Sequence, residues 1–265
     1  MTPNTHYDPI ADSYDASRSW PLAVMAGFTT GLAYLLPVDG PVLEVGVGTG
    51  RIAAPLREKL IPVTGLDISQ SALQKCAGKF ARSGNAELRL VQADAIQLPF
   101  AASTFRGVYT VHVYHLVQNW RQALSEVRRV LQPGGVYLNG TSNEVATDIT
   151  NHMEVGWEMI LKRNNLEGNN NNAGVRSRSI FHEALKESGA GLEVVPICRW
   201  SENYSPRQRL ELMSGRLATI SPRVPNMVFS KCMVDYERWL KAQYGELDSR
   251  LDLVREAVFH VWRWG

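Results

Sequence analysis

Apolar runs of strand length alternate with segments of helical periodicity over the first half of the chain. Short apolar runs of this kind predict buried strands, and apolar residues at three- and four-residue spacing predict helices. The predicted strands span 42–45, 63–66, 87–92, 105–113 and 136–140, and the predicted helices span 21–36, 51–59, 69–83 and 120–131. Strands that alternate with helices favour a parallel sheet with right-handed crossovers.

The pattern changes after residue 141. Helical spacing predicts helices, and strand-like runs predict strands, over 142–163, 179–188, 192–200 (strand), 206–219, 228–244 and 254–264 (strand). The polar tract 164–172 is rich in asparagine and is typical of a loop. Helices that fall between the last two strands predict a helical cap inserted near the C-terminus.

Three glycines at alternate positions follow the first predicted strand. Gly46, Gly48 and Gly50 allow positive φ angles and let a ligand lie directly on the backbone. The start of the next helix offers unpaired N–H groups, so the stretch indicates a nucleotide-like cofactor. A dinucleotide fingerprint requires a third glycine at position 51 or 53, which hold Arg51 and Ala53. The spacing therefore disfavours a nicotinamide-dependent oxidoreductase.

Acidic residues follow the next two predicted strands. Asp67 ends the second strand, Asp94 follows the third, and 110–116 continues from the fourth. Because the carboxyl ends of parallel strands meet at one edge of the sheet, we expect these segments to converge there with the glycines. Each carboxylate has an alternative role, as a helix cap or as a turn residue.

Composition limits the possible partners. The 265 residues are 45% hydrophobic and 20% charged, with a net charge of +2, which favours a globular protein and gives no strong attraction to nucleic acid or to an anionic membrane. The three cysteines are scattered and predict neither a metal site nor a disulfide framework. The polar N-terminus lacks a signal-peptide pattern and no run reaches membrane-spanning length, so we expect a cytoplasmic protein without membrane insertion.

Four motifs occur in order along the chain. They are Glu44-Val45-Gly46-Val47-Gly48-Thr49-Gly50, Gly65-Leu66-Asp67-Ile68-Ser69, Ala93-Asp94-Ala95-Ile96-Gln97-Leu98-Pro99-Phe100 and Arg129-Val130-Leu131-Gln132-Pro133-Gly134-Gly135. Over residues 7–140 the chain resembles class I S-adenosylmethionine (SAM)-dependent methyltransferases of the quinone-biosynthesis-like group, which act mostly on small molecules. This resemblance implies an α/β fold with a doubly wound, mostly parallel, seven-stranded Rossmann-like sheet. It implies one domain over 1–265, with a helical cover over 1–36, a SAM-binding core over 37–141, and the remaining strands with a helical substrate cap over 142–265.

The resemblance also implies a cofactor, SAM, with S-adenosylhomocysteine as its product. The residues that it implies for cofactor binding are Tyr14, Arg18, Glu44, Gly46, Gly48, Gly50, Asp67, Ile68, Asp94, Ala95 and Val111. In this assignment Glu44 orients the methionine amino group, and Asp67 accepts hydrogen bonds from the two ribose hydroxyls. Asp94 accepts a hydrogen bond from the adenine amino group.

A general base is needed only if the methyl acceptor must lose a proton, because a sulfonium methyl group is already activated. His115 is the candidate catalytic residue and His112 the second candidate, since histidine titrates near neutral pH; for both, simple packing is the alternative. Alternation along a strand would place His112 and Tyr114 on one face and His115 on the other.

The acceptor pocket is expected within 142–180 and 201–245, which are rich in aromatic residues. The alternative is that these aromatic residues form a second small core. Six arginines in this part could bind an acidic acceptor or be solvated: Arg176, Arg178, Arg207, Arg209, Arg216 and Arg223.

The sequence thus predicts an enzyme that moves a methyl group from SAM to a small-molecule acceptor, as a monomer or homodimer. The alternative is a SAM-binding sensor or partner protein without catalysis. The acceptor atom, whether O, N, C or S, is left open.

Overall fold

The computed structural model describes residues 20–83, 88–145, 149–166, 174, 178–215 and 225–265. The chain divides into two compact units. The first unit takes the described residues up to 141, within 172–198 and from 257 to 265, and the second takes those within 142–171 and from 199 to 256.

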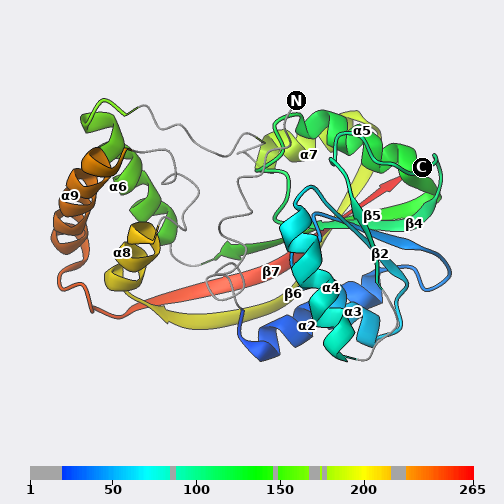
Figure 1. Cartoon of the computed structure of the whole chain (residues 1–265), viewed down its shortest axis with the longest axis horizontal. Helices are drawn as coiled ribbons and strands as arrows, with labels where there is room; N and C mark the ends of the chain where they lie inside the picture. The colour runs from blue at the N-terminus through cyan, green and yellow to red at the C-terminus, as the bar shows by residue number, and fades with distance from the viewer. Residues whose placement is uncertain (1–19, 84–87, 146–148, 167–173, 175–177, 216–224) are drawn as a thin grey trace. The chain divides into compact units, whose positions relative to one another are not determined.

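A seven-stranded sheet in the order β3-β2-β1-β4-β5-β7-β6 organises the fold (Figure 1). Its strands are β1 (Val42–Val45), β2 (Val63–Asp67), β3 (Arg89–Gln92), β4 (Phe105–Val111), β5 (Leu131–Glu144), β6 (Ala190–Tyr204) and β7 (Leu251–Trp264). β1 is parallel to β2 and β4, β2 to β3, and β4 to β5. The predicted α/β fold with a mostly parallel seven-stranded sheet is confirmed.

β7 runs against β5. The Val145 N–H donates to the Val254 carbonyl oxygen, whereas a Cβ built on Gly140 would meet the Phe259 ring, so the residue numbers run in opposite directions. β5 is also longer than predicted, because the Pro-Gly-Gly turn at 133–135 lies inside it as an irregularity. The pairing shifts from Phe105↔Leu131 to Gly107↔Val136 across this turn.

Helices cover both faces of the sheet in the first unit. These are α2 (Leu22–Leu35), α3 (Ala53–Glu58), α4 (Gln70–Ser83), α5 (Trp120–Val130) and α7 (Arg178–Glu187). Figure 1 shows α5 and α7 on one face and α2, α3 and α4 on the other. The sheet is buried between them, and all four residues of β1 are buried. Burial on both faces explains why the central strands read as continuous apolar runs.

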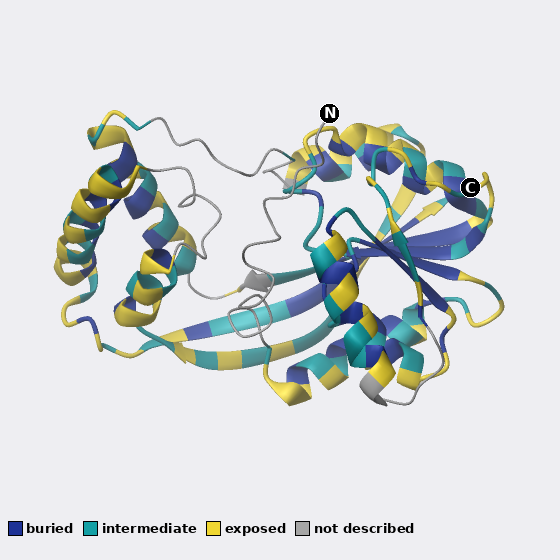
Figure 2. Ribbon diagram, in the orientation of Figure 1, coloured by how far each residue is buried: buried dark blue, intermediate teal, exposed yellow. Residues whose placement is uncertain are grey.

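The second unit has its own core. Its helices are α6 (Ile149–Arg163), α8 (Pro206–Ser214) and α9 (Asn226–Tyr244), with α9 in contact with both of the others. Trp157 and Tyr236 are fully buried there, among the dark-blue positions of Figure 2. Of the aromatic residues that suggested an acceptor pocket, these two therefore form a second core.

β4 ends two residues earlier than predicted, and this overturns the expected alternation of His112, Tyr114 and His115. His112 has a φ of 56°, in the left-handed region that a non-glycine residue rarely adopts. Strand geometry therefore stops at Val111, and the chain turns instead of continuing. Tyr114 is buried against Tyr137 of β5.

Within the described residues, no helix is long and apolar enough to cross a membrane.

Candidate functional site

The glycine loop leaves β1 in a conformation that glycine alone adopts without strain. Gly46, Gly48 and Gly50 have φ angles of 78°, 53° and 78°. The N–H groups of Gly46 and Val47 both donate to the Leu66 carbonyl oxygen, at 2.7 and 2.9 Å. The loop is therefore tied to the end of β2.

The three glycines face different surroundings. A Cβ on Gly46 would lie 2.5 Å from Val113 Cγ2, and one on Gly50 would lie 2.5 Å from Cys76 Sγ. A Cβ on Gly48 would have no heavy atom within 4 Å among the parts of the chain that are described. Gly46 and Gly50 thus allow close packing, whereas Gly48 presents bare backbone to open space, where a ligand could lie against it.

The Asp67 carboxylate lies at the end of β2 and bridges two backbone segments. Its Oδ2 accepts a hydrogen bond from Gly48 N at 2.8 Å, and its Oδ1 accepts one from Ser69 N at 2.9 Å. The Ser69 hydroxyl in turn accepts a hydrogen bond from Ala72 N at 3.2 Å, so Ser69 rather than Asp67 caps α4. Each carboxylate oxygen can accept more than one hydrogen bond, so Asp67 can still accept hydroxyl groups of a ligand.

Glu44 is a buried carboxyl group in the middle of the sheet. It is 2% exposed and pairs in register with Tyr109 of β4, whose hydroxyl donates to Glu44 Oε2 at 2.7 Å. Burial raises the Glu44 pKa to about 8, against the lowering effects of the Tyr109 hydrogen bond and the Arg51 charge. In this structure Glu44 is therefore mostly protonated at neutral pH.

Asp94 lies past the end of β3 in a local turn. Its Oδ1 accepts a hydrogen bond from Ile96 N at 3.1 Å, and the Ala93 N–H donates to the Asp67 carbonyl oxygen at 3.0 Å. The side chain of Asp94 is exposed. The structure thus brings Asp94, with Ala95, to the same sheet edge as Asp67, and its carboxylate also serves as a turn residue.

An aromatic cluster lies beside the glycine loop. The Arg51 guanidinium is 4.9 Å from the centre of the Trp20 ring, and the His112 ring centre is 6.3 Å from it. Val111, the last residue of β4, precedes His112. Sequence reasoning did not include Trp20 or Arg51, and their position becomes evident only in the folded chain.

The other predicted site residues are less defined. The His115 carbonyl oxygen accepts a hydrogen bond from Gly174 N at 3.1 Å, and the His115 side chain is half-buried. Ile68 follows Asp67, and its carbonyl oxygen accepts a hydrogen bond from Gln92 Nε2. Tyr14 and Arg18 lie outside the described residues.

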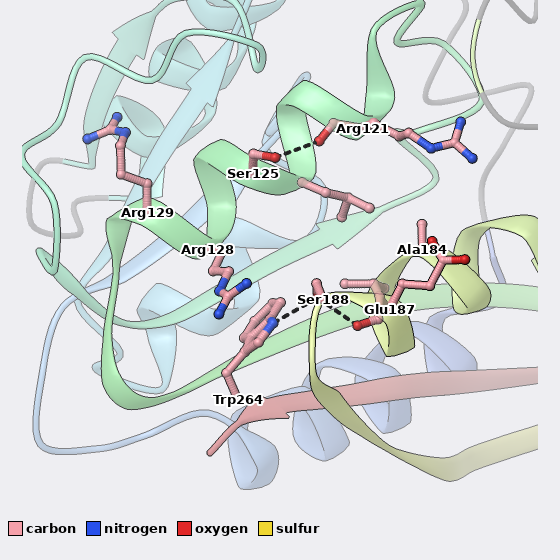
Figure 3. Close-up of a pocket in the computed structure, with 10 residues that line it drawn as sticks. Arg121, Ser125, Arg128, Arg129, Ala184, Glu187, Ser188 and Trp264 are labelled. Atoms are coloured by element: carbon pink, nitrogen blue, oxygen red, sulfur yellow. Dashed lines mark hydrogen bonds between the residues drawn. The ribbon is translucent and has the colours of Figure 1, made fainter.

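A separate hollow of about 580 Å³ lies between α5 and α7 (Figure 3). Arg128 lies over the Trp264 ring, and the Trp264 indole donates to Ser188 Oγ at 2.9 Å. None of its lining residues belongs to the glycine loop or to the strand ends described above. It is therefore distinct from the candidate cofactor site.

No group of three or more His, Cys, Asp or Glu side chains is arranged to hold a metal ion within the described ranges.

The different surroundings of two glycines give a stability prediction. Both Gly48→Ala and Gly50→Ala place an L-residue at positive φ, which costs about 1 to 2 kcal/mol. Gly50→Ala also collides with Cys76, and overpacking of this kind costs a further 1 to 3 kcal/mol or about that. We expect chemical denaturation to show Gly50→Ala as the less stable variant. Adding Cys76→Ala should recover part of the loss specifically for Gly50→Ala, and equal stability of the two single variants would contradict the loop geometry.

The raised Glu44 pKa predicts a loss of stability in alkaline solution. The folded protein holds this proton up to about pH 8, whereas the unfolded chain releases it near 4.5. The Glu44 contribution to the free energy of unfolding should therefore fall by about 1.4 kcal/mol per pH unit between these two values. Glu44→Gln should remove this slope, with little difference from the natural protein at pH 5 and greater stability at pH 8. Parallel pH–stability curves for the two proteins would show that Glu44 titrates normally.

Comparison with known proteins agrees with this geometry. Residues 43–139 match the family model described as a methyltransferase domain. A fatty-acid O-methyltransferase of Mycolicibacterium smegmatis is 40% identical over 99 residues, which are 37% of this chain and 35% of the relative. A ubiquinone/menaquinone biosynthesis C-methyltransferase of Desulfotalea psychrophila is 39% identical over 102 residues, which are 37% of this chain and 40% of the relative.

The alignments with these two relatives cover little more than a third of each relative's length. Over the longer span, a solved structure of a putative methyltransferase from Bacillus halodurans has a TM-score of 0.61 and 19% identity, and covers 90% of this chain and 97% of that one. This likeness concerns the fold. The family match, by contrast, includes the glycine loop, Asp67 and Asp94. Residues 43–139 therefore form a methyltransferase domain of the class I, SAM-dependent type.

Proposed function

We propose that this protein transfers a methyl group from SAM to a small-molecule acceptor. The observation that carries the proposal is the bare backbone of Gly48, which faces open space next to the Asp67 carboxylate. A nucleoside with a charged amino-acid part needs such a surface: close-approach backbone, an acceptor for hydroxyl groups and a nearby acidic group. SAM supplies the activated methyl group when bound, and the residues of the chain hold and orient the two reactants.

Each predicted cofactor residue has a role in this proposal. Asp67 accepts hydrogen bonds from the ribose hydroxyls while it keeps Gly48 in place. Asp94 and the Ala95 N–H recognise the adenine ring. Glu44 provides negative charge for the amino group, because a nearby cation favours the ionised form of a carboxyl group and lowers its pKa. The buried position of Glu44 thus makes its charge dependent on the ligand.

Acceptor binding is assigned to the second unit, together with the segment after β4. His115 follows β4 and is the candidate base for an acceptor that must lose a proton. The relatives named above include a fatty-acid and a quinone-biosynthesis methyltransferase, so we propose an organic acceptor with an apolar part. We also propose a cytoplasmic protein, because its three cysteines are free thiols, as is usual in a reducing compartment.

A SAM-binding protein without methyl transfer is the second candidate. It is favoured by the limits of the family match, which ends at residue 139 and leaves the second unit unmatched. Incubation with radiolabelled SAM and a panel of fatty acids, quinols and phenols distinguishes the two. A labelled product supports the enzyme, whereas tight SAM binding with no product from any acceptor supports a sensor or partner protein.

Calorimetric titration with SAM and S-adenosylhomocysteine tests the cofactor site. Gly48→Ala should weaken both ligands by about tenfold or more, because its methyl group occupies the space in which the ligand would lie. Asp67→Ala should weaken them similarly, since it removes a hydrogen-bond acceptor and the support of the loop.

Asp39→Asn is the control, because Asp39 pairs with Arg106 at the opposite, amino end of β4. It should leave both affinities unchanged, and thermal unfolding should show that each variant is folded at the titration temperature. If neither ligand binds the natural protein, or if folded Gly48→Ala binds as tightly as the natural protein, the proposed site is wrong.

A further inference from the structure

The second unit contains an arginine whose charge is not matched by a carboxylate. Of the six arginines noted in this part of the sequence, the structure describes the side chains of Arg207 and Arg209, which lie two residues apart on α8. Arg207 is exposed and forms two hydrogen bonds with Asp248, at 2.6 and 2.7 Å. This arrangement is typical of a solvated surface pair.

Arg209 has a different environment. It is half-buried, and its one hydrogen bond within the described residues runs from Nε to the Tyr236 hydroxyl oxygen at 3.4 Å. The Tyr236 hydroxyl uses its own proton to donate to the Met153 carbonyl oxygen at 2.8 Å. A guanidinium has five N–H donors, so four donors of Arg209 have no acceptor in the described part of the chain. No carboxylate there lies within 4.0 Å of it.

The neighbours of Arg209 do not neutralise it. Burial raises the Tyr236 pKa to about 12, although Arg209 acts to lower it. Burial also raises the Tyr204 pKa, so both phenols are uncharged at neutral pH. Burial lowers the Arg209 pKa, but the oxygens of Tyr236, Tyr204 and Glu154 raise it by more, and the guanidinium stays charged. The cation is therefore held among neutral groups.

A second donor without an acceptor lies in the same cluster. The Trp157 ring centre is 5.3 Å from that of Tyr236, and Trp157 is fully buried. Its indole Nε1 has no hydrogen-bond partner within the described ranges. A buried polar group without a partner costs free energy, and a partly buried charge without a counter-charge costs more. The second unit thus combines N–H donors, positive charge and aromatic surface.

We propose that Arg209, with Tyr204 and Tyr236, forms a binding site for the oxyanion of a small organic molecule, either a carboxylate or a phosphate. A guanidinium binds both groups through two parallel hydrogen bonds, which supplies the missing counter-charge. The aromatic side chains around it suit a ligand with an apolar or aromatic body. The identification of this ligand with the methyl acceptor rests on the proposed function and would make the acceptor an acid; the anion site itself does not depend on methyl transfer.

Calorimetric titration with benzoate, phenyl phosphate and benzamide tests the site in the full-length protein. Benzamide has nearly the shape of benzoate but no charge, so it should bind at least tenfold more weakly than benzoate, or about that. Arg209→Gln should weaken the bound anion by about tenfold, and Arg209→Lys should retain part of the affinity, because it keeps the charge and loses the paired donors. The stronger of benzoate and phenyl phosphate identifies the oxyanion class.

Arg207→Gln is the matched control, since it removes a neighbouring exposed arginine from the same helix and should leave anion binding unchanged. Titration of Arg209→Gln with S-adenosylhomocysteine should give the natural affinity, which shows that the variant is folded. The proposal is overturned if neither anion binds the natural protein up to its solubility limit, or if benzamide or Arg209→Gln binds as well as the anion and natural protein. Anion binding without S-adenosylhomocysteine binding would overturn the proposed function alone.

Discussion

The Asp67 carboxylate connects the parts of the first unit that form the candidate site. It bridges the N–H groups of Gly48 and Ser69, so the glycine loop after β1 and the start of α4 are held against the end of β2. This bridge requires a loop with positive φ angles, which only the three glycines adopt without strain. A residue that the resemblance assigns to ligand binding is thus also a structural residue, and loss of function on its removal has two causes.

Burial determines the chemistry of the two most unusual ionisable side chains. Glu44 lies in the sheet, where its partner is the hydroxyl of Tyr109, and desolvation keeps it protonated. Arg209 lies in the second unit beside Tyr236 and keeps its charge without a carboxylate within ion-pair distance in the described chain. In each case a neutral phenol faces an ionisable group. Opposite charge brought by a ligand would stabilise both groups, because it would favour the ionised Glu44 and compensate the charge of Arg209.

The aromatic residues of the second unit show how composition can mislead. Trp157 and Tyr236 suggested an acceptor pocket, yet both are fully buried in a small core between α6 and α9. A unit of this size needs large apolar side chains to bury enough surface, and aromatic residues contribute the most area per residue. The polar atoms of these rings, rather than their faces, are what the core leaves available near Arg209.

The sequence alone determined the order of strands and helices, the glycine loop and the strand ends that carry Asp67 and Asp94, because periodicity and glycine spacing are local properties of the chain. Only the tertiary structure decided that β4 stops at Val111 and that His112 turns away, since this depends on a single backbone angle. The pairing of Glu44 with Tyr109 also needed the fold, because strand register joins residues 65 positions apart. The same holds for Arg207 and Arg209, which look alike in sequence and differ only in what surrounds them.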